Sequence, residues 1–174
     1  MGSARHFFVV VALALLGFGG GLQPATGAEG AYCTVTWVID IDPGLSLEPS
    51  TGTHRSDGVT ALHCDGSVNG HRVTGPGRFS EDGPYGTDDP DTCQSGGEAT
   101  GIDRLTIPTA DGPQQIDSEF KAVFGKLSNQ GGLFHGEFSG TRFSGTFEFR
   151  VLEGDCVTTP ITRAEVTSKG IIHD

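Results

Sequence analysis

The residues that decide the fold are GGLFHGEFSGTRFSGTFEFRVLE, at positions 131–153. Within them Phe143, Phe147 and Phe149 fall on one parity, while Glu148 and Arg150 fall on the other. Alternation with a period of two is typical of a β-strand that buries one face and exposes the other. We therefore predict that this stretch belongs to a half-buried sheet.

The tetrapeptide Phe-Ser-Gly-Thr occurs twice in this stretch, at 138–141 and again at 143–146. The shift between the copies is odd, so on one regular strand they would face opposite sides of the sheet. If both copies are to bury the same side, the chain has to bend between them. We predict a hairpin turn or a β-bulge at residues 139–142.

The first 28 residues have the features of a cleavable signal peptide. A basic start containing Arg5 precedes the unbroken apolar run FFVVVALALL at 7–16, and small residues at 25–28 suit a signal peptidase. The apolar run is shorter than the roughly 20 residues of a membrane-spanning helix. We expect residues 29–174 to form a single secreted β domain, extracellular or in the cell envelope, with no stable membrane insertion after processing.

The charge balance narrows the classes of partner. The chain has 22 Asp and Glu residues against 11 Lys and Arg residues, which gives a formal net charge of −11. Nucleic acids and anionic membranes would be repelled by such a surface. We expect a monomer whose partner is a small apolar ligand or another extracellular protein, and no nucleic-acid partner.

Strand patterns and turn signals continue along the rest of the chain. The turn dipeptide Asp65-Gly66 predicts a hairpin between residues 59–64 and 67–73. No window after residue 28 combines helical spacing of apolar residues with capping signals. The sequence therefore predicts an all-β fold, a small antiparallel β-barrel or β-sandwich. Further strands are expected at 32–41, 99–107, 114–124 and 161–172.

The four cysteines predict two disulfides, because their number is even and the chain is expected to be exported. Spacing alone leaves three pairings open. We favour Cys33 with Cys156, which would join the two ends of the domain, and Cys64 with Cys93, which would anchor the acidic segment 75–97.

The segment 75–97 is rich in glycine, proline and acidic residues, which predicts a long surface loop around a short strand at 78–80. Asp82, Asp88, Asp89 and Asp91 lie close enough in sequence to converge on calcium, a cation that prefers carboxylate and carbonyl oxygens. The spacing matches no EF-hand. The alternative is a solvated loop that confers solubility.

The aromatic residues suggest a second kind of site. Glycines at 136, 140 and 145 alternate with phenylalanines, a pattern that favours strong strand curvature and hence a barrel or a tightly coiled sandwich. The aromatic side chains would then fill the core or line an apolar pocket. The candidate ligand-binding residues are Trp37, Phe134, Phe138, Phe147 and Phe149.

No nucleophile motif is present, and no cofactor is expected. The sequence favours a secreted, non-enzymatic binding or interaction protein that carries a small hydrophobic ligand. A β-barrel hydrolase or isomerase is the enzymatic alternative, with Asp40 and Asp42 or Glu137 and Glu148 as carboxylates, neither pair being singled out. The third class is a protein-interaction or inhibitor module that presents the loop at 80–91.

Overall fold

The computed structural model describes residues 30–127 and 133–174, so the predicted signal peptide lies outside the described residues. The described chain forms nine β-strands. They are β1 (Ala31–Leu45), β2 (Gly52–Val68), β3 (His71–Arg72), β4 (Arg78–Tyr85), β5 (Gly97–Ile107), β6 (Gln114–Phe124), β7 (Leu133–Gly140), β8 (Phe143–Glu153) and β9 (Ile161–Ile172).

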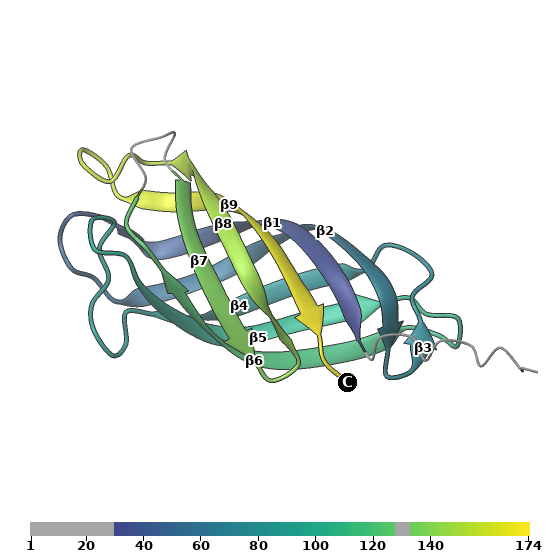
Figure 1. The fold of residues 1–174 in the computed structure, drawn as a ribbon. Helices are drawn as coiled ribbons and strands as arrows, with labels where there is room; N and C mark the ends of the chain where they lie inside the picture. The colour runs from purple at the N-terminus through teal and green to yellow at the C-terminus, as the bar shows by residue number, and fades with distance from the viewer. Residues whose placement is uncertain (1–29, 128–132) are drawn as a thin grey trace, which may run out of the picture.

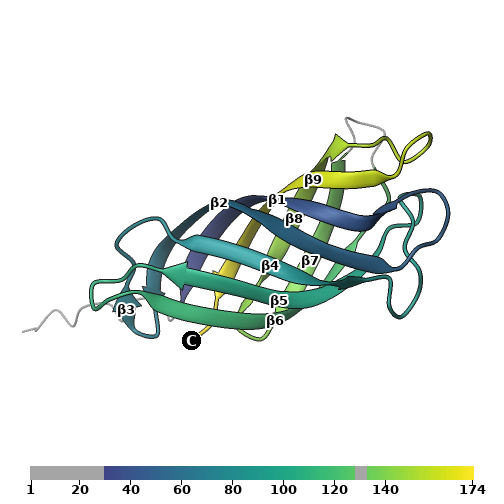
Figure 2. The same ribbon diagram turned by 180° about the vertical axis from the view of Figure 1, so that it is seen from behind.

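Eight of these strands close into an antiparallel barrel (Figures 1 and 2). Around the barrel the order is β1, β9, β8, β7, β6, β5, β4 and β2, and pairing of β1 with β2 closes the ring. The two-residue β3 pairs with the end of β2 outside the ring. Of the two predicted all-β architectures, the barrel is therefore correct, and closure removes the exposed strand edges of a sandwich.

The barrel interior follows from strict alternation along the strands. In β6, for example, every second residue from Ile116 to Phe124 is buried, and the residues that alternate with them are exposed. At the end of the barrel that holds β3 and the C-terminus the inward side chains are apolar and almost fully buried. We call this layer the packed end, and it comprises Val35, Leu62, Val68, Leu105, Ile107, Ile116 and Ile172.

The Phe-rich stretch forms the hairpin of β7 and β8, and the predicted turn is confirmed because the strands meet at residues 141–142. Phe138 and Phe143 are both buried inside the barrel, as the repeated tetrapeptide requires. Gly136 is the cross-strand partner of Phe147, and a Cβ on Gly136 would lie 2.4 Å from the Phe147 Cζ. The glycine is needed because the aromatic ring lies directly over its backbone.

The predicted hairpin turn at Asp65-Gly66 is wrong. Both residues lie inside β2, and the chain turns instead at Asn69-Gly70. These two residues have positive φ values of 51° and 75°. Asn-Gly is the strongest short hairpin signal because both positions of a type I′ turn need positive φ.

The segment 75–97 is also more regular than a long loop. β4 runs through its first half, and Phe79, Glu81 and Tyr85 face inward and are buried. Only residues 86–96 connect β4 to β5 at the end of the barrel opposite β3, which we call the loop end.

The predicted disulfide pairing is wrong, although both disulfides are present. The bonds join Cys33 to Cys64 and Cys93 to Cys156. Cys33 and Cys64 are cross-strand partners in β1 and β2, with Cα atoms 4.1 Å apart. The ends of the domain do meet, but through pairing of β1 with β9, which places Gly170 opposite Cys33.

Two disulfides indicate an oxidising environment, extracellular or in the cell envelope. Within residues 30–127 and 133–174 there is no helix of the length and apolarity that crossing a membrane requires.

Candidate functional site

A cavity of about 80 Å³ lies inside the barrel. Its lining reaches Leu45, Tyr85 and Phe124 near the loop end but includes neither Leu62 nor Leu105. The cavity therefore begins beyond the packed end, occupies the middle of the barrel and extends towards the loop end. Its volume is enough for several water molecules or one small ligand.

Aromatic side chains form about half of the cavity wall, and four of the five predicted ligand-binding residues are among them. Trp37, Phe138, Phe147 and Phe149 line the cavity. Phe134 does not, because it is fully buried behind the wall and stacks on Phe149 with ring centroids 4.1 Å apart. Whether these residues bind a ligand stays a prediction.

Two carboxyl groups interrupt the apolar wall. Glu81 in β4 and Asp103 in β5 are direct cross-strand partners, so their side chains project from adjacent strands into the barrel. Both line the cavity, and only 8% of Glu81 and 3% of Asp103 are exposed. We call Glu81 and Asp103 the interior carboxyl pair.

Trp37 holds one member of the interior carboxyl pair. Its indole Nε1 donates a hydrogen bond to Oε1 of Glu81 over 2.9 Å, and its ring packs on Phe79 with centroids 4.7 Å apart.

The neighbouring strand β2 bulges here, since its residues 57–59 lie opposite a single residue of β1. The backbone N–H of Glu81 therefore donates to the Ser56 hydroxyl instead of a β2 carbonyl.

Both carboxyl groups have raised pKa values. Burial is the main reason that the pKa of Glu81 lies above its ordinary value, and the hydrogen bond from Trp37 partly opposes it. Burial also raises the pKa of Asp103, and the negative charge of Glu81 raises it further. Because two like charges in one apolar site oppose each other, the interior carboxyl pair retains a proton at neutral pH.

Two further polar side chains line the cavity without a hydrogen-bond partner in the structure. His54 in β2 is 7% exposed, and its Nδ1 is buried and unpaired. Burial lowers the pKa of His54 to about 4, so the imidazole is neutral at physiological pH. Ser168 in β9 is 1% exposed, and its hydroxyl is likewise buried and unpaired.

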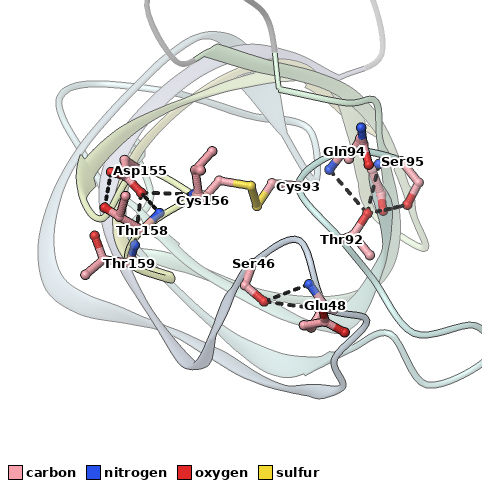
Figure 3. Close-up of a disulfide and its surroundings, with 12 residues drawn as sticks. Ser46, Glu48, Thr92, Cys93, Gln94, Ser95, Asp155, Cys156, Thr158 and Thr159 are labelled. Atoms are coloured by element: carbon pink, nitrogen blue, oxygen red, sulfur yellow. Dashed lines mark hydrogen bonds between the residues drawn. A yellow bond between two sulfur atoms is a disulfide. The ribbon is translucent and has the colours of Figure 1, made fainter.

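The disulfide between Cys93 and Cys156 lies across the loop end, where it joins the β4–β5 connection to the β8–β9 connection (Figure 3). Both cysteines are buried. The Cys93 N–H donates to the Ser46 carbonyl over 3.0 Å, and the Leu127 N–H donates to the Cys93 carbonyl over 2.9 Å. These bonds fasten residues from four connections over the opening of the barrel.

The structure disperses the four predicted calcium ligands. Asp82 forms an ion pair with Arg104, and Asp88 lies 4.0 Å from the Lys121 ammonium. Asp89 is exposed, whereas Asp91 is buried and accepts a hydrogen bond from the Glu98 N–H. The described parts of the chain contain no group of three or more side chains that could hold a metal ion. Calcium binding stays a prediction that this geometry does not support.

The interior carboxyl pair is the main feature that sequence reasoning missed. Neither pair considered from the sequence faces the cavity. Asp40 bonds to Arg163 and Glu148 lies 3.4 Å from His135, while Asp42 and Glu137 are exposed. The parity of β5 carried the signal, because an inward Leu105 and Ile107 place Asp103 inward too. Glu81 was missed because the strand predicted in this segment ended at residue 80, whereas β4 continues to Tyr85.

No family model, no curated protein and no solved structure matches this chain.

Proposed function

We propose that the protein is a secreted binding protein that encloses a small, mostly apolar ligand inside its barrel. One observation carries the proposal: an aromatic cavity that contains unpaired polar side chains and a buried carboxyl pair. Concave, mostly apolar sites with a few convergent polar groups are typical of small-molecule binding.

The cavity is lined by two kinds of side chain, aromatic and polar, and each kind supports this function. The rings of Trp37, Phe120, Phe147 and Phe149 would bury the ligand's apolar body. The interior carboxyl pair, His54 and Ser168 would orient the ligand's polar group, since polar groups left unpaired in an apolar interior are costly. A structural role alone would be met better by apolar residues at these positions.

Native mass spectrometry of the disulfide-bonded protein, incubated with a library of small organic compounds, tests the proposal. We expect one-to-one adducts that disappear on denaturation. Ala122→Leu should abolish them, because Ala122 lines the cavity and a longer side chain would fill it. Ala61→Leu is the matched control, since Ala61 is exposed on β2.

Adducts that persist unchanged in Ala122→Leu would place the ligand outside the cavity and contradict the proposal. The absence of adducts across the library would contradict it as well. The remaining interpretation would then be a protein-interaction module.

A second candidate function, an isomerase, is favoured by the raised pKa values of Glu81 and Asp103. One carboxyl that stays protonated can donate a hydrogen bond to a ligand oxygen while its ionised partner removes a proton from carbon. Returning that proton to a second carbon moves a double bond and needs no oxidant.

The isomerase function is tested by following, through absorbance, the conversion of a small β,γ-unsaturated ketone to its conjugated isomer. A rate that is unchanged in Asp103→Asn would contradict the isomerase function.

A further inference from the structure

The polar groups of the cavity offer acceptors in excess of donors. Once ionised, the interior carboxyl pair has only acceptor oxygens, and Trp37 satisfies one of them. The Ser168 hydroxyl adds an unpaired oxygen, and the Nδ1 of His54 is unpaired too. A ligand that complements this set has to bring several donors of its own.

In the described chain the interior carboxyl pair also has no cationic side chain beside it, so negative charge that develops on it would be uncompensated. Among the described residues no lysine or arginine lines the cavity, and His54 is neutral because burial lowers its pKa. Buried charges in proteins are normally paired, so the carboxyl pair needs either a proton or a cation supplied from outside.

We propose that the ligand of this cavity is a small primary amine, whose ammonium group binds at Glu81 and Asp103 and whose apolar body packs against the aromatic wall. The inference rests on the proposed binding function and adds the chemical class of the ligand. An ammonium group carries three donors and one positive charge, which match the acceptors and the charge of the pair.

Two features outside the carboxyl pair favour the same ligand class. Aromatic faces attract cations, and Trp37, Phe79, Phe120 and Phe147 all line the cavity. The chain's net charge of −11 would also raise the local concentration of cations and repel anions.

Binding should release protons, because the ammonium group stabilises the ionised form of the pair. The titratable groups around the pair are His54 on β2 and Tyr85 on β4, which also face the cavity, and Asp82 on β4, whose charge acts on both His54 and Glu81. Burial raises the pKa of Tyr85, so its phenol keeps its proton at neutral pH. Asp82 is exposed and paired with Arg104. The proton released on binding therefore comes from Glu81 or Asp103.

Isothermal titration calorimetry with two matched series tests the amine inference. The probes are benzylamine, benzyl alcohol and benzoate, and isobutylamine, isobutanol and isobutyrate, all at about neutral pH where the amines are cationic. Within at least one series we expect the amine to bind about tenfold or more tightly than the alcohol, a difference of about 1.4 kcal/mol. The carboxylate should not bind. Titrations in buffers of different ionisation enthalpy should show proton release with the amine only.

Glu81→Gln and Asp103→Asn should each weaken amine binding about tenfold or more and leave alcohol binding within about twofold. Glu119→Gln, an exposed position on β6, is the control and should change neither. Thermal unfolding checks that every variant folds; should one of the two pair variants not fold, the other still decides.

Alcohols that bind as tightly as their amines, or amine binding that Glu81→Gln and Asp103→Asn leave unchanged, would overturn the amine inference while the proposed binding function stands. Failure of both amines to bind would overturn it as well. Persistence of binding in Ala122→Leu would instead remove the cavity itself as the site.

Discussion

Asp103 and Leu105 lie two positions apart on β5, face the same way and are almost equally buried, at 3% and 1% exposure. Leu105 belongs to the packed end, where apolar side chains close the barrel. Asp103 lines the cavity and places a carboxyl next to that of Glu81. Equal burial therefore has opposite energetic consequences along one strand face.

This contrast between Leu105 and Asp103 distinguishes the residues that stabilise the barrel from those that are available to bind a ligand. Burying a leucine side chain contributes roughly 1.5–3 kcal/mol, whereas burying an unpaired carboxyl costs stability. Residues that cost stability in a closed interior are candidates for function.

The largest expected effect is on the packed end. Leu105→Ala should lower the free energy of unfolding by about 2–5 kcal/mol, since it leaves a cavity in a fully buried layer. Asp103→Asn, two residues away, should leave stability nearly unchanged at neutral pH, because an amide of almost the same size replaces a carboxyl that burial already keeps protonated. Urea denaturation monitored by Trp37 fluorescence measures both. Equal losses in the two variants would break the comparison.

The two disulfides should differ less in how much each one contributes to the free energy of unfolding. Replacing both cysteines of either bridge by serine should cost about 2–4 kcal/mol, mainly because the unfolded chain regains freedom. Cys93 and Cys156 are 63 positions apart and Cys33 and Cys64 only 31, so loss of the first bridge should cost about 0.6 kcal/mol more. Urea denaturation of the two double variants measures the difference. A smaller loss for the Cys93–Cys156 bridge would show that native contacts at the loop end outweigh chain entropy.

The smallest expected effect is a pH dependence that originates in the cavity. The folded-state pKa values of Glu81 and Asp103 are raised, so the folded protein binds more protons than the unfolded chain, and stability falls as pH rises above about 4–4.5. His54 acts oppositely: its folded pKa of about 4 lies below the unfolded value of 6.5, so its contribution is lost as pH falls from 6.5 to about 4.

Together these groups predict a stability maximum at mildly acidic pH and a loss of about 1–3 kcal/mol by about pH 8. Asp103→Asn should flatten the alkaline side, while His54→Leu should flatten the acid side. Urea denaturation across this pH range measures both slopes. A wild-type stability that rises steadily from about pH 5 to 8 would mean that the carboxyl pair is better solvated than its burial implies.

Much of the barrel could be predicted from local patterns. Residues 114–124 alternate cleanly and form β6, and the repeated tetrapeptide located the β7–β8 turn. The turn dipeptide Asp65-Gly66 was misleading, because it lies within the long strand β2. The chain turns at Asn69-Gly70 instead, where both residues adopt the positive φ values that a two-residue hairpin turn needs.

The candidate site, too, could be predicted from the sequence only in part. Four of the five predicted aromatic residues line the cavity, because inward parity and aromatic character can both be read locally. Glu81 and Asp103 could not be paired in advance. Their adjacency depends on the β4–β5 register, and the strand predicted at 78–80 ended one residue before Glu81.

By itself, the sequence determined the fold class, the inward faces of the strongest strands and the presence of two disulfides, because alternation and cysteine number are local properties of the chain. Only the tertiary structure decided which cysteines pair and which carboxyls share the cavity. Both depend on strand neighbours, and ring closure brings β1 beside both β2 and β9. No local pattern encodes the register that places Glu81 beside Asp103, and with it the polar centre of the barrel.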